Sequence, residues 1–231
     1  AIGFSKVGIP STGAVIVNNM VTNSSFGGTP EAPAMLPTGA IAAIRSGNDA
    51  IVRDNLIRNS AYNGITGGRN VVVDRNTIEA TCLVLDDCGG IYVFGRDLNT
   101  TISSNTIRNL VGTNEGKPPN EFDKPHTVGI YLDEHSSRVR VTGNIVSNAQ
   151  YGIQLHNAFD NDVSQNHLYG NRTYQLWLQA GRNEVKSSGD VFGNVINSNT
   201  FVPTEHGVSV SLDSLFDSTD DFAHFDANLY S

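Results

Sequence analysis

Short stretches in which apolar and polar residues alternate recur along the chain. The phrase GIYLDE, which begins at Gly129, returns 23 residues later as GIQLHN, which begins at Gly152. Every second residue is apolar in both copies, as Ile130 and Leu132 show for the first, and this period of two is typical of a β-strand that buries one face. A unit of this length cannot bury a core alone, so it must stack on copies of itself. The pattern therefore predicts a solenoid of short strands.

A recurring Asn follows a second short strand in successive units. It precedes two mostly apolar residues and occupies positions Asn19, Asn55, Asn76, Asn105, Asn144 and Asn166. Identical Asn side chains can stack in parallel sheets whose strands lie about 4.8 Å apart, and Asn tolerates the left-handed backbone that tight turns need. We therefore expect these Asn residues at the turns of a parallel β-helix.

This pattern resembles the right-handed parallel β-helix repeat proteins, from about Val15 to Phe201. The resemblance implies an all-β, right-handed parallel β-helix (solenoid). It is specific for the fold and much less so for the activity, because the superfamily includes lyases, epimerases, hydrolases and noncatalytic fibres. We expect residues 1–231 to form one domain. The N-terminal GAVIVNNMVTN looks like the second half of a coil, which favours a fragment of a longer chain.

Stacking the coils aligns equivalent side chains into files. The predicted interior files are Ile91, Ile130, Ile153 and Leu176, and Val93, Leu132, Leu155 and Leu178, with Ile44 and Ile65 continuing the first. The predicted outward files are Thr66, Tyr92, Tyr131, Gln154 and Trp177, and Gly68, Phe94, Asp133, His156 and Gln179. Aromatic faces suit sugar rings and the polar file suits hydroxyl groups, so a groove for a linear polysaccharide is expected. The alternative is that the aromatic side chains only stabilise the sheet face.

Two segments depart from the regular repeat. An insertion at 112–126 carries Lys117, Lys124 and His126 and is expected to line the ligand site, because insertions commonly fall on the binding face. The alternative is an ordinary solvated loop. The segment at 24–39 is rich in Pro and Gly and predicts a loop. The final section from Gly207 is expected to keep a strand at Val208 and Val210, to lose the Asn register and to end as an acidic tail or cap. Its acidic residues, Asp217, Asp220, Asp221 and Asp226, could bind calcium but match no calcium loop, so we predict no metal site and no cofactor.

Composition narrows the possible partners. A net charge of −8 with 15 scattered Lys and Arg residues argues against nucleic acid. The sequence lacks an apolar run of 18 residues, so we expect no membrane insertion. Cys82 and Cys88 could close a small disulfide or remain two buried thiols. The disulfide, together with Ala rather than Met at the first position, favours a secreted, periplasmic or cell-surface protein.

Elimination or epimerisation of a uronic acid needs a base, an acid and a cation that neutralises the sugar carboxylate. His156 or Tyr131 could move protons, and the candidate cations are Lys117, Lys124, Arg96 and Arg138. The run of Tyr131, Asp133 and His135 is similar to the Tyr, Asp and His cluster of mannuronan C5-epimerases, although the spacing differs by one residue and the proline-containing motif of that family is absent. The candidate catalytic residues are Asp133, His156, Tyr131, Glu134 and His135.

Glycoside hydrolysis needs two carboxyl groups across the scissile bond, and Asp86, Asp87, Asp133 and Glu134 are candidates. The DDC at 86–88 looks like part of a polygalacturonase motif, but the following Gly-His-Gly and Arg-Ile-Lys elements are absent. The candidate substrate-binding residues are Tyr92, Phe94, Gln154, Trp177, Gln179, Lys117, Lys124 and His126. We predict an extracellular enzyme that acts on a linear, uronic-acid-containing polysaccharide by lyase or epimerase chemistry. The alternatives are a glycoside hydrolase and a noncatalytic carbohydrate-binding or fibre-like solenoid.

Overall fold

The computed structural model describes residues 12–24, 42–110, 112–113, 125–181, 191–215 and 218–231. It also places the backbone of three short strands, β1 (Ile2–Gly3), β2 (Ser5–Lys6) and β3 (Ile9–Pro10). Lys117 and Lys124, Asp217 and nearly all of the expected loop at 24–39 lie outside the described residues. The predictions for these residues therefore stay predictions.

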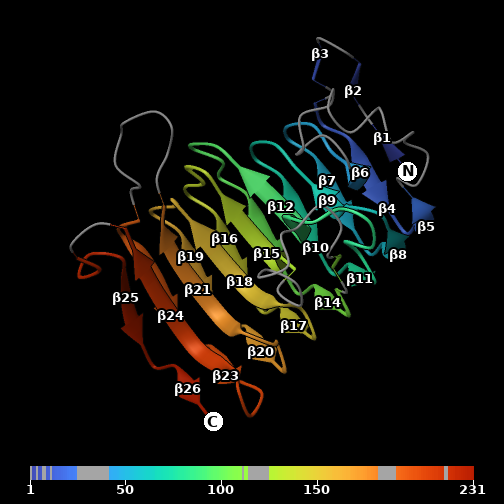
Figure 1. Ribbon diagram of the computed structural model, residues 1–231. Coiled ribbons are helices and arrows are strands. Elements are labelled where there is room, and N and C mark those ends of the chain that lie inside the picture. Colours follow the sequence, from blue (N-terminus) through green and yellow to red (C-terminus); the bar gives the residue numbers. More distant parts are fainter. Residues whose placement is uncertain are drawn as a thin grey trace.

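The chain winds through three parallel sheets, one strand per sheet in each turn (Figure 1). The first sheet consists, in order, of β1, β6 (Ala42–Arg45), β9 (Asn63–Thr66), β12 (Cys88–Phe94), β15 (Thr127–Asp133), β18 (Tyr151–His156), β21 (Tyr174–Ala180) and β24 (Val208–Ser214). The second consists of β25 (Ala223–Asp226), β22 (Asn194–Asn197), β19 (Asp162–Ser164), β16 (Arg140–Thr142), β13 (Thr101–Ser103), β10 (Val72–Asp74), β7 (Ile51–Arg53) and β4 (Val15–Val17). The third consists of β26 (Leu229–Tyr230), β23 (Thr200–Val202), β20 (His167–Tyr169), β17 (Ile145–Ser147), β14 (Thr106–Arg108), β11 (Thr77–Glu79), β8 (Leu56–Ser60) and β5 (Met20–Ser24).

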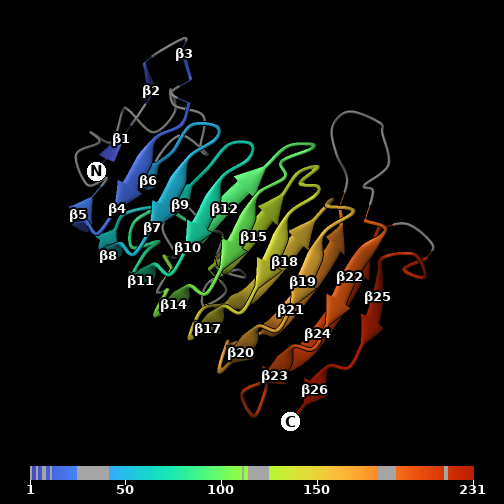
Figure 2. The same ribbon diagram turned by 180° about the vertical axis from the view of Figure 1, so that it is seen from behind.

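These three sheets form the predicted parallel β-helix, whose coils follow one another from β4 and β5 to β25 and β26 (Figure 2). Both predicted interior files are confirmed, because Ile91 pairs with Ile130 and the register continues through Ile153 to Leu176. These side chains are fully buried. Among the residues that the structure describes, no helix is long and apolar enough to span a membrane.

The recurring Asn residues form a continuous hydrogen-bonded ladder between the second and third sheets. Each donates its backbone N–H and its Nδ2 to the Oδ1 of the Asn one coil further on, at 2.9–3.0 Å. The predicted stacking is therefore confirmed. The ladder also extends through Asn199 to Asn228, so the expectation that the C-terminal section loses the Asn register is wrong. That section forms another coil, with β25 and β26 paired to β22 and β23.

The expected backbone conformation of the ladder residues is also wrong. The left-handed residue at each corner is the one immediately before the ladder Asn, as in Asp54 (φ 56°), Ser104 (φ 54°) and Ala227 (φ 51°). The physical reason is that the corner needs one left-handed residue, while the ladder Asn must keep its side chain turned into the solenoid to reach the next coil. The two tasks are divided between two neighbouring residues.

The glycines of the repeated phrase are required by close packing between coils. A Cβ built on Gly129 would lie 2.6 Å from the backbone oxygen of Gly152, and one built on Gly152 would lie 2.3 Å from the backbone oxygen of Gln175. Real Cβ atoms do not approach other atoms so closely. The GIYLDE and GIQLHN phrases therefore share a glycine because the neighbouring strand occupies the side-chain space.

Candidate functional site

The candidate site lies where strands of the first sheet end. Asp133 is the last residue of β15 and His156 is the last residue of β18. As predicted, they are adjacent, because His156 Nδ1 lies 2.9 Å from Asp133 Oδ1. The phenol of Tyr92 donates to the other carboxylate oxygen at 2.8 Å. Both oxygens of Asp133 are thus held by side chains from the two neighbouring coils.

This network favours the charged forms of Asp133 and His156. Burial alone would raise the pKa of Asp133, but hydrogen bonds from the imidazole, a backbone N–H and the phenol outweigh it, so its pKa lies below the ordinary value. Burial alone would lower the pKa of His156, but the hydrogen bond and the charge of Asp133 outweigh it, so its pKa lies above the ordinary value. The two groups therefore shift each other toward the imidazolium and carboxylate forms.

Glu134 and Asn157 also lie beside the imidazole. Glu134 Oε1 lies 3.9 Å from His156 Nδ1 and accepts a hydrogen bond from Asn157 Nδ2 at 3.1 Å. Ligand atoms of Asp133, Glu134 and His156 lie within 4.8 Å of one another, so these three residues could hold a divalent cation. The same arrangement suits a proton on the imidazole, and a metal would have to compete with it.

A disulfide-closed loop approaches the pair from the preceding coil. Cys82 and Cys88 form a disulfide, and the loop between them presents Asp86 and Asp87. Although Asp87 is exposed at the surface, the protein displaces enough water around it to raise its pKa. The negative charges of Asp133 and Asp86 raise the pKa of Asp87 further. The pKa values of Asp87 and Asp133 are therefore shifted in opposite directions.

His126 covers most of the predicted aromatic file. Its ring lies 5.5 Å from the ring of Tyr131 and 5.9 Å from that of Trp177, and its Nε2 lies 2.7 Å from Gln154 Oε1. The file has the predicted register, yet Tyr131 is 3%, Gln154 0% and Trp177 9% exposed. The expectation of an open aromatic surface is wrong here, because aromatic rings on adjacent strands pack together and His126 closes over them. Their proposed role in substrate binding stays a prediction.

The segment that carries His126 is fixed to the disulfide-closed loop. The His126 backbone N–H donates to Asp86 Oδ1 at 2.6 Å, and the Cys88 N–H donates to the His126 carbonyl at 3.1 Å. The end of the insertion at 112–126 therefore lies beside the candidate site, as predicted.

Neutral phenols dominate the covered face. Burial, followed by the charge of Asp133, raises the pKa of both Tyr92 and Tyr131 far above the ordinary value, and burial raises the pKa of Tyr151 to about 12. A phenol with a raised pKa stays neutral and can donate a hydrogen bond, but it gives up its proton less readily than an ordinary phenol. The prediction that Tyr131 moves protons stays a prediction.

The remaining predicted residues lie at the margin. Phe94 aligns with Asp133 and is 57% exposed, and Gln179 aligns with His156. Gln179 Oε1 accepts from Gln154 Nε2 at 3.0 Å. His135 follows the end of β15 with a left-handed backbone (φ 63°), so it leaves the alternation that places Asp133 in its file. Gly68, the first member of the predicted polar file, lies beyond the end of β9. Strand pairing in that file therefore begins at Phe94, which pairs with Asp133.

The two predicted cations within the described residues have other partners. Arg138 lies 3.3 Å from a carboxylate oxygen of Asp97, and the guanidinium of Arg96 lies over the ring of Phe159. Sequence reasoning missed Asp213, which accepts a hydrogen bond from Trp177 Nε1 at 2.5 Å. It aligns with Gln179, so extending the polar file by one coil would have found it.

Comparison with known families identifies the repeat. A family model described as a right handed beta helix region matches residues 7–214. The chain belongs to this family. The predicted right-handed parallel β-helix is therefore confirmed. Comparison with curated proteins found no match.

Solved structures share the fold at low identity. The complex structure of XylC with xylose is 16% identical, with a TM-score of 0.46; the match covers 68% of this chain and 28% of that one. A mutant of the periplasmic alginate epimerase AlgG is also 16% identical, with a TM-score of 0.47; the match covers 88% of this chain and 44% of that one. The chain thus spans less than half the length of either protein, and the likeness concerns the fold alone.

Proposed function

We propose that this β-helix is a carbohydrate-active enzyme that cleaves a glycosidic bond with Asp87 and Asp133 as its two carboxyl groups. The observation that carries this proposal is the arrangement around Asp133. This carboxylate is held ionised by His156 and Tyr92, and it acts electrostatically on a second carboxyl group whose pKa is shifted the opposite way. Such pairs with divergent pKa values are the pattern of acid–base catalysis by carboxyl groups.

The pKa shifts assign the roles. Asp87, whose pKa is raised, keeps its proton to a higher pH and would protonate the leaving oxygen. Asp133, whose pKa is lowered, stays ionised and would act as base or nucleophile. His156 would hold the carboxylate in place and keep it ionised while the acid works.

Charge favours hydrolysis over the uronic-acid chemistry that the sequence alone suggested. Abstraction of a proton next to a carboxylate requires a cation that neutralises the substrate charge. Four carboxyl groups (Asp86, Asp87, Asp133 and Glu134) gather in the described part of the site, with the imidazole groups of His126 and His156 near Asp87, while Arg96 lies over Phe159 and Arg138 beside Asp97. An uncharged polysaccharide is therefore the better substrate for this surface.

Elimination or epimerisation remains the second candidate. The observation in its favour is that an imidazole and a neutral phenol both contact Asp133, which offers two proton-transfer groups at one point. The cations it needs would be Lys117 and Lys124. We also infer one domain and an extracellular or periplasmic location, since disulfides persist in oxidising compartments.

The test is a survey of substrates. The protein is incubated with neutral polysaccharides such as xylan and β-glucan and with alginate and polygalacturonate, and reducing ends and unsaturated-uronate absorbance are measured together. We expect new reducing ends on a neutral polymer without that absorbance. If the absorbance rises on a uronic-acid polymer and the neutral polymers are unchanged, the proposed reaction is elimination and not hydrolysis.

Variants then test the residues. On the substrate found, Asp87→Asn and Asp133→Asn should each lower kcat by about two orders of magnitude or more. Asp97→Asn is the matched control, because Asp97 is an exposed carboxylate on a nearby turn that pairs with Arg138. Full activity in either catalytic variant would remove that residue from the mechanism.

A further inference from the structure

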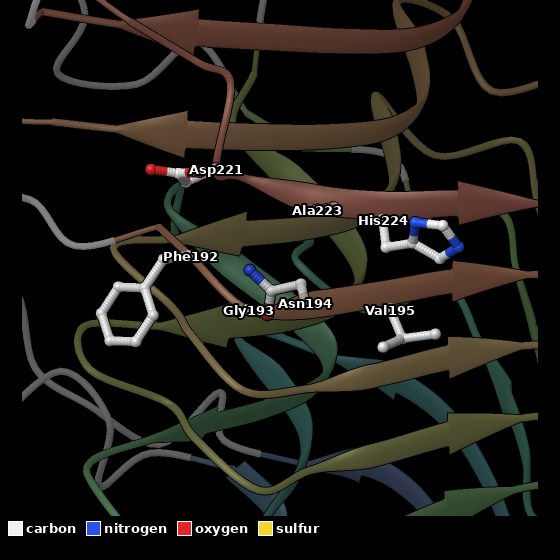
Figure 3. A pocket seen from close by; sticks show the side chains of 7 residues that line it. All are labelled: Phe192, Gly193, Asn194, Val195, Asp221, Ala223 and His224. Atoms are coloured by element: carbon white, nitrogen blue, oxygen red, sulfur yellow. The ribbon is translucent and has the colours of Figure 1, made fainter.

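A depression lies away from the candidate site, on the C-terminal coils. Its volume is about 610 Å³, and it is lined by Phe192, Gly193, Asn194, Val195, Asp221, Ala223 and His224 (Figure 3). These residues come from β22, from β25 and from the segments that lead into them. The volume falls within the range of small-molecule sites. None of these residues contributes to the Asp133–His156 network.

An aromatic stack fixes one wall of this depression. The rings of Phe159 and Phe192 lie 4.9 Å apart with an angle of 12° between their planes. The guanidinium carbon of Arg96 lies 5.4 Å from the centre of the Phe159 ring. Phe192 is nevertheless 40% exposed. Three planar groups from successive parts of the solenoid thus hold an accessible ring in one orientation, which reduces the entropy cost of binding against it.

The backbone around the ring is equally well fixed. Asn194 is buried, and its Nδ2 donates to the carbonyl oxygens of Ala158 and Phe222, both at 3.0 Å. The Gly193 N–H donates to the Asp221 carbonyl at 3.2 Å. Asn194 therefore ties the coil before the depression to the coil after it, and the walls keep their spacing.

The chemistry of the lining is that of a sugar site. Phe192 and Val195, both 40% exposed, supply apolar surface. Asp221 and His224 are exposed residues of the lining, with His224 beside Val195 on the neighbouring strand, and they can accept and donate hydrogen bonds to hydroxyl groups. A pyranose ring has one apolar face and a rim of hydroxyl groups, so it matches both surfaces. We propose that this depression binds an uncharged sugar ring of a glycan chain.

Charge decides against an acidic sugar. Asp221 lines the depression, and a Cβ on Gly193 would lie 2.5 Å from Asp160 Oδ1, so a second carboxylate borders it. The cation of the stack, Arg96, lies against Phe159 rather than in the lining. A uronate would therefore meet like charge, whereas a neutral ring would not. This binding needs no cleavage chemistry and stands independently of the proposed function.

The experiment is isothermal titration calorimetry of the full chain with xylohexaose, cellohexaose and, as the charged comparator, hexagalacturonate. All measurements are made in the His156→Ala variant. This substitution removes the key imidazole of the candidate site and leaves this depression intact. We expect at least one neutral hexasaccharide to bind and the hexagalacturonate to bind at least about tenfold more weakly. Phe192→Ala should then weaken the neutral ligand about tenfold or more.

Tyr169→Ala is the matched control, because Tyr169 is a 42% exposed aromatic residue on β20 of the third sheet. It should leave the affinity unchanged, while His224→Ala, a second variant in the lining, should weaken it. Circular dichroism of Phe192→Ala checks that the fold is kept. Failure of both neutral ligands to bind, equal affinity in Phe192→Ala, or preferential binding of the hexagalacturonate would each overturn the proposal.

Discussion

Removing one member of the Asn ladder should destabilise the solenoid by several kcal/mol. Asn105 is fully buried. Its Oδ1 accepts two hydrogen bonds from Asn76, at 2.9 and 3.0 Å, and its Nδ2 donates to Val73 and Asn144, both at 2.9 Å. Asn105→Ala removes all four. At about 0.5–1.5 kcal/mol each, the loss is about 2–6 kcal/mol, and we expect about 4 because the buried partners are left unsatisfied.

Urea unfolding followed by circular dichroism measures this loss, with the midpoint and the slope compared together because solenoids can unfold in parts. For a chain of this size, about 4 kcal/mol corresponds to a fall in Tm of about 8–16 °C. Asn197→Ala is the control, since Asn197 accepts only an exposed hydrogen bond from the next residue, and it should cost about 0.5 kcal/mol or less. Equal losses in the two variants would refute the view that the ladder stabilises the fold.

Three further predictions concern packing and the site. Gly152→Ala should cost about 3 kcal/mol in urea unfolding, because its Cβ would meet a backbone oxygen of the next strand at 2.3 Å, whereas Gly67→Ala, whose Cβ would meet nothing closer than 3.3 Å, should cost much less. Because the pKa of His156 is raised in the folded protein, its protonation contributes free energy of folding fully below the ordinary pKa of 6.5, and this contribution is lost as the pH rises through the folded pKa. The destabilisation caused by His156→Gln, measured by urea unfolding, should therefore be smaller at pH 9 than at pH 6. The same destabilisation at both pH values would contradict this. Tyr92→Phe removes a hydrogen bond that lowers the pKa of Asp133, so the acid limb of the pH profile of kcat/KM should move to higher pH. If the limb does not move, the acid limb does not report the ionisation of Asp133.

The alternation of apolar residues was sufficient to predict the interior register and, with it, the meeting of Asp133 and His156. A period of two fixes which face each residue occupies, and stacking then fixes its neighbour in the next coil. This is why a pair 23 residues apart could be placed side by side from sequence alone.

Other features depend on interactions that no period encodes. His126 closes over Tyr131 because a loop end is held by the Asp86 carboxylate, and loop conformations follow from such individual contacts. The role of Asp87 emerges only from the charges that surround it. The last coil was missed because its acidic residues favoured a solvated tail or cap, although Asn228 follows the same two-residue corner as the earlier ladder members.

The corner before each ladder Asn has the same length in every coil, one left-handed residue and then the Asn, from Asn18 and Asn19 to Ala227 and Asn228. The connections that enter the first sheet vary instead, from the disulfide-closed segment before β12 to the insertion before β15. Differences in loop length thus fall at the two edges of the first sheet, including the long connection between β21 and β22, and not at the ladder corner. A protein engineer could exchange those connections to alter what the molecule recognises while leaving the amide-bonded edge, and the stability it provides, untouched.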